Sequence, residues 1–215
     1  MKFTRWDVLH DAGGYSASRE FQRIRDDLVD AISRTVWPPG SPSFTVYPES
    51  GKKTGKGNGV KPIKVGFTSA LVEHGWTLEK RAPRQIATEP NAVLKGSQPG
   101  AFDCHLSFPA DVPQPFVVEW ETGNISSSHR AINRIGLGML RSYVSGGILI
   151  VPSSRLAPFL TDRIGNEGEL QPYRELWKDW SFVKYGYFAI VSVEHDHESF
   201  DVPRIPKGTD GRAQA

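Results

Sequence analysis

Three acidic side chains in two strand-like segments have the types and spacing of a cation site. Asp103 lies in a segment where polar and apolar residues alternate, so its side chain is expected on the polar face of a strand. Glu119 and Glu121 are two residues apart in a second such segment, which places both carboxylates on one face, about 6–7 Å apart. If the segments form a hairpin that turns about Asp111, Asp103 falls opposite Glu119, with β-carbons about 4.5–5.5 Å apart.

Carboxylates gathered in this way repel one another unless a cation lies between them. Oxygen ligands of this kind favour Mg²⁺, with Mn²⁺ as a substitute. In the alternative interpretation, Glu119 and Glu121 line the solvent-facing side of a strand, Asp103 lies elsewhere, and no site forms. The spacing alone leaves both interpretations open.

The composition indicates one globular domain. The chain has 215 residues, of which 38% are hydrophobic and 11% aromatic, enough for a sizeable core. No apolar run approaches the roughly 20 residues of a membrane span. The first residues lack the apolar region of a signal peptide, and the single cysteine, Cys104, excludes an internal disulfide. We therefore expect a soluble, cytoplasmic protein, with one domain over residues 1–202 and a flexible polar tail over 203–215.

The charge is unevenly distributed along the chain. The formal net charge is only +2. Residues 51–100, however, contain nine Lys and Arg side chains against three Glu side chains, a local charge of +6. Such a basic block suits a groove that binds a polyanion, although a solvated lysine-rich loop explains it equally well.

The periodicity of apolar residues predicts an α/β fold with one central mixed β-sheet flanked by helices. Helices are expected near residues 18–34, 62–74, 127–145 and 170–180. Strands are expected at 44–47, 76–81, 101–108, 116–121, 148–151 and 185–193. The strand at 148–151 is apolar throughout, as expected of a strand covered on both faces.

Several sequence blocks resemble a known nuclease family. Trp76-Thr77-Leu78-Glu79, Gly100-Ala101-Phe102-Asp103 and Val118-Glu119-Trp120-Glu121, with helices on either side, look like the α-βββ-α-β core called PD-(D/E)xK. The blocks 57–64, 75–79 and 119–130 are more closely similar to the BamHI/BglII-type restriction endonucleases, and the last block is the most distinctive. The resemblance covers roughly residues 18–151.

The resemblance implies a type II restriction endonuclease, a homodimer that cuts both strands of a short palindromic DNA site with Mg²⁺ and is paired in its host with a methyltransferase. It implies that Asp103, Glu119 and Glu121 are catalytic and that Asp103 and Glu119 bind the metal. Glu121 stands where many relatives of this core carry lysine, which leaves its role open between general base and water orientation. A fourth acid often completes such sites, and Glu20 and Glu73 are both candidates.

Basic and amide side chains are candidates for DNA contacts. Lysines near the basic loop would neutralise phosphates, and donors at the start of the 127–145 helix would contact base edges or phosphates. These candidates are Lys61, Lys64, Lys80, Asn124, Ser126, Ser127, His129, Arg130, Asn133 and Arg134.

Two alternatives to a restriction enzyme remain at this point. One is a DNA-binding protein on the same fold that no longer cleaves, and the other is a repair or structure-specific nuclease. Three retained acids argue against the first, because a protein that does not cut DNA has no need to hold repelling carboxylates together. Among the remaining features, the run 195–198, rich in His and acids, is interpreted as a turn in solvent, and Cys104 as a small buried apolar residue.

Overall fold

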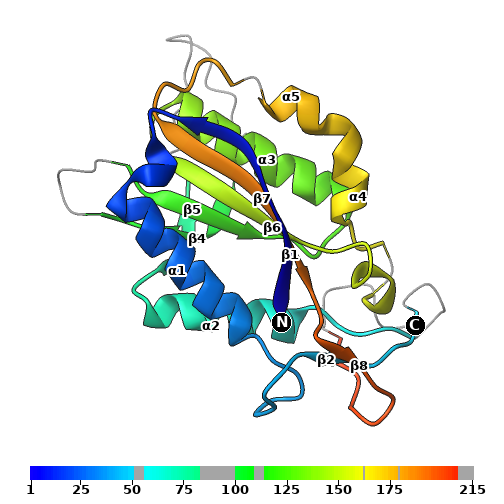
Figure 1. Ribbon diagram of the computed structural model, residues 1–215. Coiled ribbons are helices and arrows are strands. Elements are labelled where there is room, and N and C mark those ends of the chain that lie inside the picture. The colour runs from blue at the N-terminus through cyan, green and yellow to red at the C-terminus, as the bar shows by residue number, and fades with distance from the viewer. Residues whose placement is uncertain (51–55, 83–99, 109–113, 162, 179, 208–215) are drawn as a thin grey trace.

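A six-stranded mixed sheet forms the centre of the chain (Figure 1). The computed structural model describes residues 1–50, 56–82, 100–108, 114–161, 163–178 and 180–207. In spatial order the strands are β1 (Lys2–Ala12), β7 (Gly186–Glu194), β6 (Gly146–Pro152), β5 (Phe116–Trp120), β4 (Ala101–Leu106) and β3 (Thr77–Arg81). A separate parallel pair joins β2 (Thr45–Val46) to β8 (His197–Glu198).

The two halves of the sheet differ in strand direction. β3, β4 and β5 are antiparallel neighbours, whereas β5, β6 and β7 run parallel, and β1 pairs antiparallel with β7. This arrangement confirms the predicted mixed sheet. Every residue of β6 is buried, as predicted for a strand covered on both faces.

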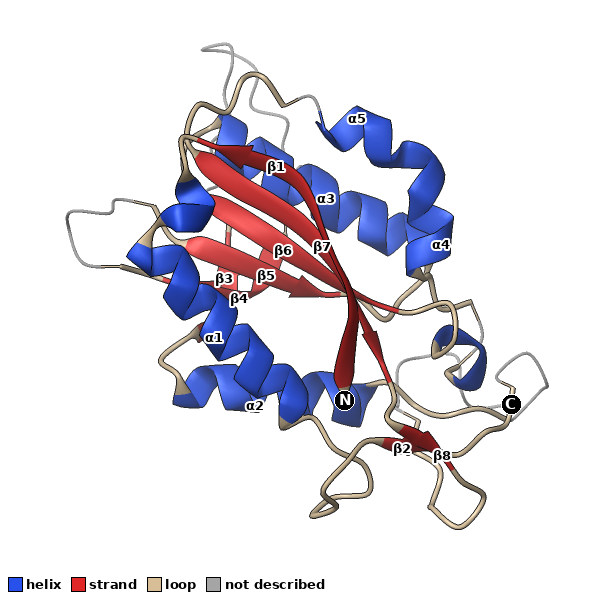
Figure 2. Ribbon diagram, viewed as in Figure 1, coloured by secondary structure: helices blue, strands red, loops and turns tan. Residues whose placement is uncertain are grey.

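Helices cover both faces of the sheet (Figure 2). α1 (Arg19–Ser33) and α2 (Lys61–Glu73) pack on one face through Ile24, Leu28, Phe67 and Leu71. α3 (Ile125–Leu140) and the short α5 (Arg174–Lys178) pack on the other through Ile132, Ile135, Met139 and Trp177. The order α2-β3-β4-β5-α3-β6 is the expected α-βββ-α-β core. Of the helices the structure describes, none is long and apolar enough to cross a bilayer.

Two of the predicted helices differ most from the structure in their bounds. The helix expected at 170–180 is divided into α4 (Glu167–Leu170), a 3₁₀ turn (Gln171–Tyr173) and α5, because Pro172 provides no backbone N–H. The helix expected at 127–145 begins at Ile125, where the Asn124 side chain accepts a hydrogen bond from Ser127 N, and it ends at Leu140.

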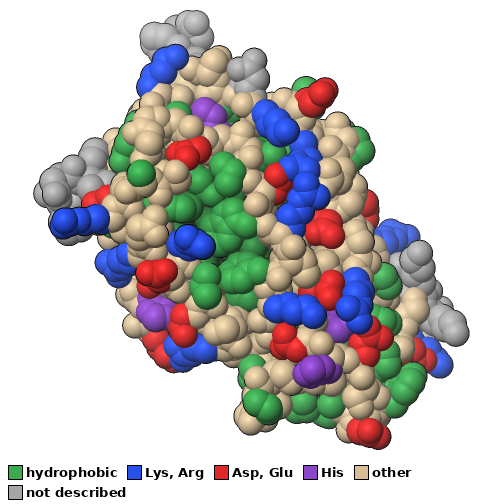
Figure 3. Space-filling view, in the orientation of Figure 1, with side chains coloured by type: hydrophobic (Ala, Val, Ile, Leu, Met, Phe, Trp, Pro, Cys, Tyr) green, Lys and Arg blue, Asp and Glu red, His purple; other side chains and the backbone are tan. Residues whose placement is uncertain are grey.

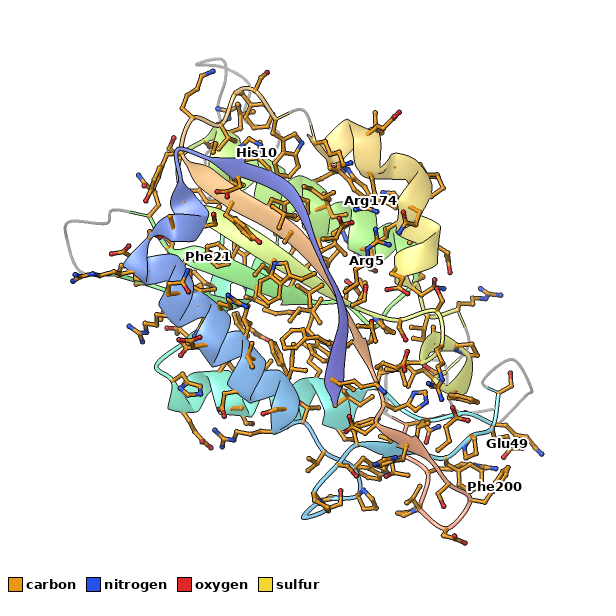
Figure 4. All side chains as sticks on the ribbon, viewed as in Figure 1. Arg5, His10, Phe21, Glu49, Arg174 and Phe200 are labelled. Atoms are coloured by element: carbon orange, nitrogen blue, oxygen red, sulfur yellow. The ribbon has the colours of Figure 1, made fainter. Side chains whose placement is uncertain are left out.

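Sequence reasoning missed β1, which pairs along β7 at the edge of the sheet. Its polar and apolar residues alternate irregularly because the register shifts twice. Asp7 of β1 forms an ion pair with Arg174, and Arg5 lies beside them (Figure 4). On the face of the sheet that α1 and α2 cover, a hollow between α1 and β1 is lined by apolar side chains (Figure 3), and the half-buried Phe3 and Trp6 pack against this core. β1 thus completes a core that the helices alone leave open.

The predicted boundary at residue 203 is wrong for the first residues beyond it. Ile205 is buried, its N–H donates to Asn58 Oδ1, and its carbonyl accepts from Gly59 N. Trp37 Nε1 donates to Pro203 O. Residues 203–207 therefore pack on the domain through backbone groups that composition does not reveal, and 208–215 lie outside the described residues.

Candidate active site

Asp103 and Glu119 meet where the ladder between β4 and β5 ends. The pair Cys104↔Val118 sets the register, and one further step along it brings Asp103 opposite Glu119, as predicted. Asp103 N donates to Glu119 Oε2 at 3.3 Å, and Trp120 N donates to Asp103 Oδ2 at 2.9 Å. At this point, side-chain carboxylates thus accept the hydrogen bonds that backbone carbonyls accept elsewhere between β4 and β5. The turn predicted about Asp111 lies outside the described residues.

The side chains of β4 do not alternate as expected. The regular alternation expected of a strand would put Phe102, Cys104 and Leu106 on one face. In the structure, Phe102 belongs to the core under α3, while Cys104 and Leu106 belong to the core under α1 and α2. The change of face coincides with Asp103, whose backbone N–H bonds to a carboxylate instead of the neighbouring strand. Cys104 is fully buried, as predicted, and burial raises the pKa of its thiol to about 12.

Lys64 brings a positive charge to Asp103 from helix α2. Pro62 lies in the first turn of that helix, and the buried face carrying Ile63 and Phe67 fixes the helix against the sheet. Lys64 projects from the neighbouring face, and its Nζ lies 2.6 Å from Asp103 Oδ1. The sequence suggests Lys64 as a DNA contact; in the free protein it lies against the candidate catalytic carboxylate.

Glu119 is buried, and its charge is opposed by Arg134 of helix α3. The side chain of Glu119 is only 5% exposed, and its Oε1 lies 3.0 Å from Arg134 Nη1. Burial raises the pKa of Glu119 to about 8, while the nearby guanidinium works in the opposite direction and Asp103 adds to the rise. Arg134 was also predicted to contact DNA, but here it is the partner of a buried acid.

Glu121 does not join the other two carboxylates. It follows the last residue of β5, and its Oε1 turns back to accept a hydrogen bond from Gly123 N at 2.6 Å. A β-carbon at Gly123 would lie 2.6 Å from this oxygen, so glycine is required for the contact. Burial raises the pKa of Glu121, and the charge of Asp103 contributes less. Within the described residues, no three acidic, His or Cys side chains are grouped as a metal site, which corrects the expected convergence of three carboxylates.

Neither proposed fourth acid is near this pair. Glu73 ends α2 and forms an ion pair with Arg34, and Glu20 lies in the first turn of α1. Sequence reasoning overlooked Glu79, an exposed residue of β3 with φ 51°, which lies between the pairs that join β3 to β4 on either side of Asp103. Glu79 lies in the strand predicted at 76–81. Its position opposite Asp103 could not be predicted, because a long connection separates β3 from β4 and leaves their register undetermined by the sequence.

Most other predicted DNA contacts lie on exposed surface. Lys61 begins α2 and Lys80 lies in β3, and both are exposed. Near the start of α3, three exposed side chains share one region; they are Ser126, Arg130 and Asn133.

Three predicted contacts instead have partners within the fold. Asn124 caps α3 by accepting from Ser127 N. Ser127 Oγ accepts from Arg130 Nη2 at 3.3 Å. His129 packs its ring against Tyr173 and Trp177, with ring centroids 4.5 and 5.6 Å away. In the free protein, Asn124 thus caps helix α3 and His129 packs against α5 and the turn before it.

The donor set around Asp103 and Glu119 fits a hard divalent cation. Both residues offer carboxylate oxygens, the ligands that Mg²⁺ prefers. Glu119 Oε1 is buried without a hydrogen-bond donor among the residues described, because its contact with Arg134 is an ion pair that lacks hydrogen-bond geometry. Arg134 compensates the charge of this oxygen, and the hydrogen-bonding capacity that stays unused is one that a metal ion would fill.

Comparison with known proteins gives one family. The family model described as "Restriction endonuclease BamHI" matches residues 1–212. The type II restriction enzyme OkrAI of Oceanobacter kriegii is 42% identical over 213 residues, covering 99% of each chain. The type II restriction enzyme BamHI of Bacillus amyloliquefaciens is 33% identical over 202 residues, covering 93% of this chain and 86% of the relative.

A solved structure supports the same fold. The restriction endonuclease BglII, solved in complex with a DNA 16-mer, matches with a TM-score of 0.57 over 90% of this chain and 79% of its own. Its sequence identity is 11%, so this likeness concerns the fold alone. With a family match over nearly the whole chain and close type II relatives, this protein belongs to the BamHI family of type II restriction endonucleases.

Proposed function

We propose that this enzyme hydrolyses one phosphodiester bond in each strand of a short palindromic DNA site, as a cytoplasmic homodimer that depends on Mg²⁺ and accepts Mn²⁺. A host methyltransferase would protect the same site. Restriction endonucleases generally use divalent metal ions, which agrees with this proposal. The observation that carries it is the pairing of Asp103 with Glu119, each opposed by its own cation.

Asp103 and Glu119 would hold the metal at the scissile phosphate. When bound there, a divalent ion supplies Lewis-acid stabilisation of the charge that develops on the phosphoryl oxygens. Asp103 is held for this task by Trp120 N, and Glu119 by its burial between β5 and α3. The two carboxylates are thus in place before DNA binds, which avoids reorganisation during the reaction.

Glu121 is assigned to the attacking water. A general base works best when its pKa is close to the operating pH, and burial raises the pKa of Glu121 above its ordinary value. Gly123 N holds one carboxylate oxygen, and the other would accept the proton of water. Lys64 would then pass from Asp103 to the phosphate as DNA enters, because its side chain is 42% exposed and free to move.

DNA would approach over the exposed start of α3 and the basic residues beside it. Ser126, Arg130 and Asn133 are the side chains there that remain available for base edges or phosphates. Lys61 and Lys80 would contact phosphates of the DNA backbone. Each phosphate that they neutralise makes the fall of log affinity with log salt concentration steeper by about 0.9.

The experiment is cleavage of unmethylated plasmid and phage DNA with Mg²⁺ or EDTA by the wild-type protein and the Glu119→Ala variant. We expect discrete fragments from the wild type with Mg²⁺ only, and no fragments from the variant. In Ca²⁺ the variant should still bind DNA in a shift assay. Asp26→Ala, at an exposed position on α1, is the matched control and should cut normally.

Each other result has a definite meaning. A smear or a ladder of nicks would contradict cutting at a defined site. Cleavage by Glu119→Ala at the wild-type rate would remove Glu119 from the active site. An unfolded variant, judged by circular dichroism, would make Glu119 structural, and Glu119→Gln would then test its charge alone.

A further inference from the structure

Arg134 joins three parts of the candidate active site. Its Nη1 lies 3.0 Å from Glu119 Oε1 and also donates to the carbonyl oxygen of Ala101. Its guanidinium carbon lies 5.8 Å from the centroid of the Phe102 ring. The helix α3, the start of β4 and the end of β5 therefore meet at a single guanidinium group.

This contact lies where the ladder between β4 and β5 has stopped. The last backbone pair on this side is Cys104↔Val118. Ala101 and Glu119 lie beyond it, on β4 and β5 respectively, and Arg134 connects them. Because Ala101 is two residues before Asp103 on the same strand, a group that ties Ala101 to Glu119 also fixes the separation of the two carboxylates.

The surroundings of Arg134 leave its guanidinium little freedom. Its side chain is 13% exposed, whereas that of Lys64, the other cation of the site, is 42% exposed. Gly100 lies beside the guanidinium: a β-carbon there would meet Arg134 Cζ at 3.6 Å, an ordinary contact distance. Lys64 can turn toward DNA without disturbing the fold, but Arg134 could do so only by leaving a buried carboxylate uncompensated.

We propose that Arg134 is a positioning residue, which holds Glu119 in register with Asp103 for cleavage and does not itself bind DNA. The inference rests on the proposed role of Glu119, which it deepens. A guanidinium is suited to this task because its planar group can donate to the Ala101 carbonyl while its charge stays next to Glu119. Lysine can keep the charge but not this geometry.

The test compares Arg134→Gln and Arg134→Lys with Arg25→Gln, a matched change at an exposed position on α1. For Arg134→Gln we expect kcat to fall at least about tenfold, a loss of transition-state stabilisation, with KM for DNA unchanged. DNA affinity in Ca²⁺ and its salt dependence should match the wild type. Arg134→Lys should recover part of kcat, and Arg25→Gln should cut normally.

A second readout does not require cleavage. Calorimetric titration of the DNA-free proteins with Mn²⁺ should show weaker binding to Arg134→Gln than to the wild type at a temperature where both are folded. In a Glu119→Gln background, adding Arg134→Gln should cause no further loss, because the residue acts through Glu119. A purely structural role would lower the melting temperature without changing Mn²⁺ affinity.

Several outcomes would overturn the proposal. Weaker DNA binding, with a salt slope reduced by about one, would make Arg134 a phosphate contact. Unchanged kcat in Arg134→Gln would remove its positioning role, provided that the wild type cuts; a wild type that does not cut would instead contradict the proposed function. If Arg134→Gln fails to fold, the double variant Glu119→Gln/Arg134→Gln decides. Recovery of folding supports charge compensation between the two residues, and continued unfolding counts against it.

Discussion

Buried ionisable side chains differ in how the fold compensates their charge, and the protonation of buried His195 is expected to depend on pH. Its side chain is fully buried at the end of β7, and Nε2 lies 3.0 Å from Glu198 Oε1. Burial lowers the pKa of His195, although the carboxylates of Glu198 and Glu194 oppose this effect. Neutral His195 therefore fits the fold better than its protonated form.

This leads to a prediction about acid stability. Because the pKa of His195 is lower in the folded chain than in the unfolded chain, its contribution is complete above about pH 6.5, the ordinary histidine value. That contribution is lost as the pH falls through the lowered pKa. Urea unfolding between pH 8 and 5 should show a steeper loss of stability in the wild type than in His195→Gln. His197→Gln, at an exposed position, should follow the wild type, and identical slopes in all three proteins would contradict the prediction.

At this scale the sequence predicts contacts between neighbours in a strand better than contacts across the fold. The two-residue period and the hairpin register were enough to place Asp103 opposite Glu119. Lys64 and Arg134 reach the same pair from different helices, and no local spacing relates them to it. For the same reason His195 was predicted to lie in a solvent-exposed turn; its burial depends on distant neighbours such as Phe159, whose ring lies 5.6 Å away.

Among the elements, α3 must pack closely on the sheet to deliver Arg134. Gly147 of β6 provides the space: a β-carbon there would lie 2.7 Å from Ile135 Cγ2, and Ile135 is buried next to Arg134 in the helix. The sequence predicted both the helix and the strand from their apolar periods. It could not predict this contact, because a glycine that follows a predicted helix indicates only where the helix ends.

Gly147→Ala should therefore reduce both stability and cleavage. The added methyl group forces Ile135 and α3 away from the sheet, at a cost of about 1–3 kcal/mol, and kcat should fall because Arg134 moves with the helix. Gly66→Ala is the matched control: it lies within α2, its new β-carbon would meet only Thr35 Cγ2 at 3.8 Å, and it should stabilise by about 0.5–1 kcal/mol. Thermal unfolding and steady-state cleavage measure both effects. A Gly147→Ala protein as stable and active as the wild type would show that α3 has room to adjust.

For the molecule as a whole, Asn58 ties together segments that lie far apart in the sequence. Its Nδ2 donates to Tyr47 O and Phe159 O, both at 2.8 Å, and its Oδ1 accepts from Ile205 N at 3.1 Å. In the sequence, Asn58 falls within the basic block 51–100, for which a solvated lysine-rich loop was one explanation, and Ile205 falls within the expected flexible tail. Both interpretations followed from polar composition. Composition does not show that one buried side-chain amide forms hydrogen bonds with several backbone groups at once.

Asn58→Ala should lower the free energy of unfolding by about 1–3 kcal/mol, because Ile205 N loses the Asn58 oxygen that accepts its hydrogen bond. Tyr47 O keeps the hydrogen bond from Glu49 N, and Phe159 O keeps the one from Asn58 N. Asn133→Ala, an exposed change on α3, should leave stability nearly unchanged, since alanine favours helix. Chemical denaturation of both variants would measure these effects. Limited proteolysis should then cut Asn58→Ala first near residue 205, because the C-terminal segment loses its anchor before the central sheet unfolds. If stability were equal to that of the wild type, the segment would have to be held by its apolar contacts alone, and removing the side chain of Ile205 rather than Asn58 would release it.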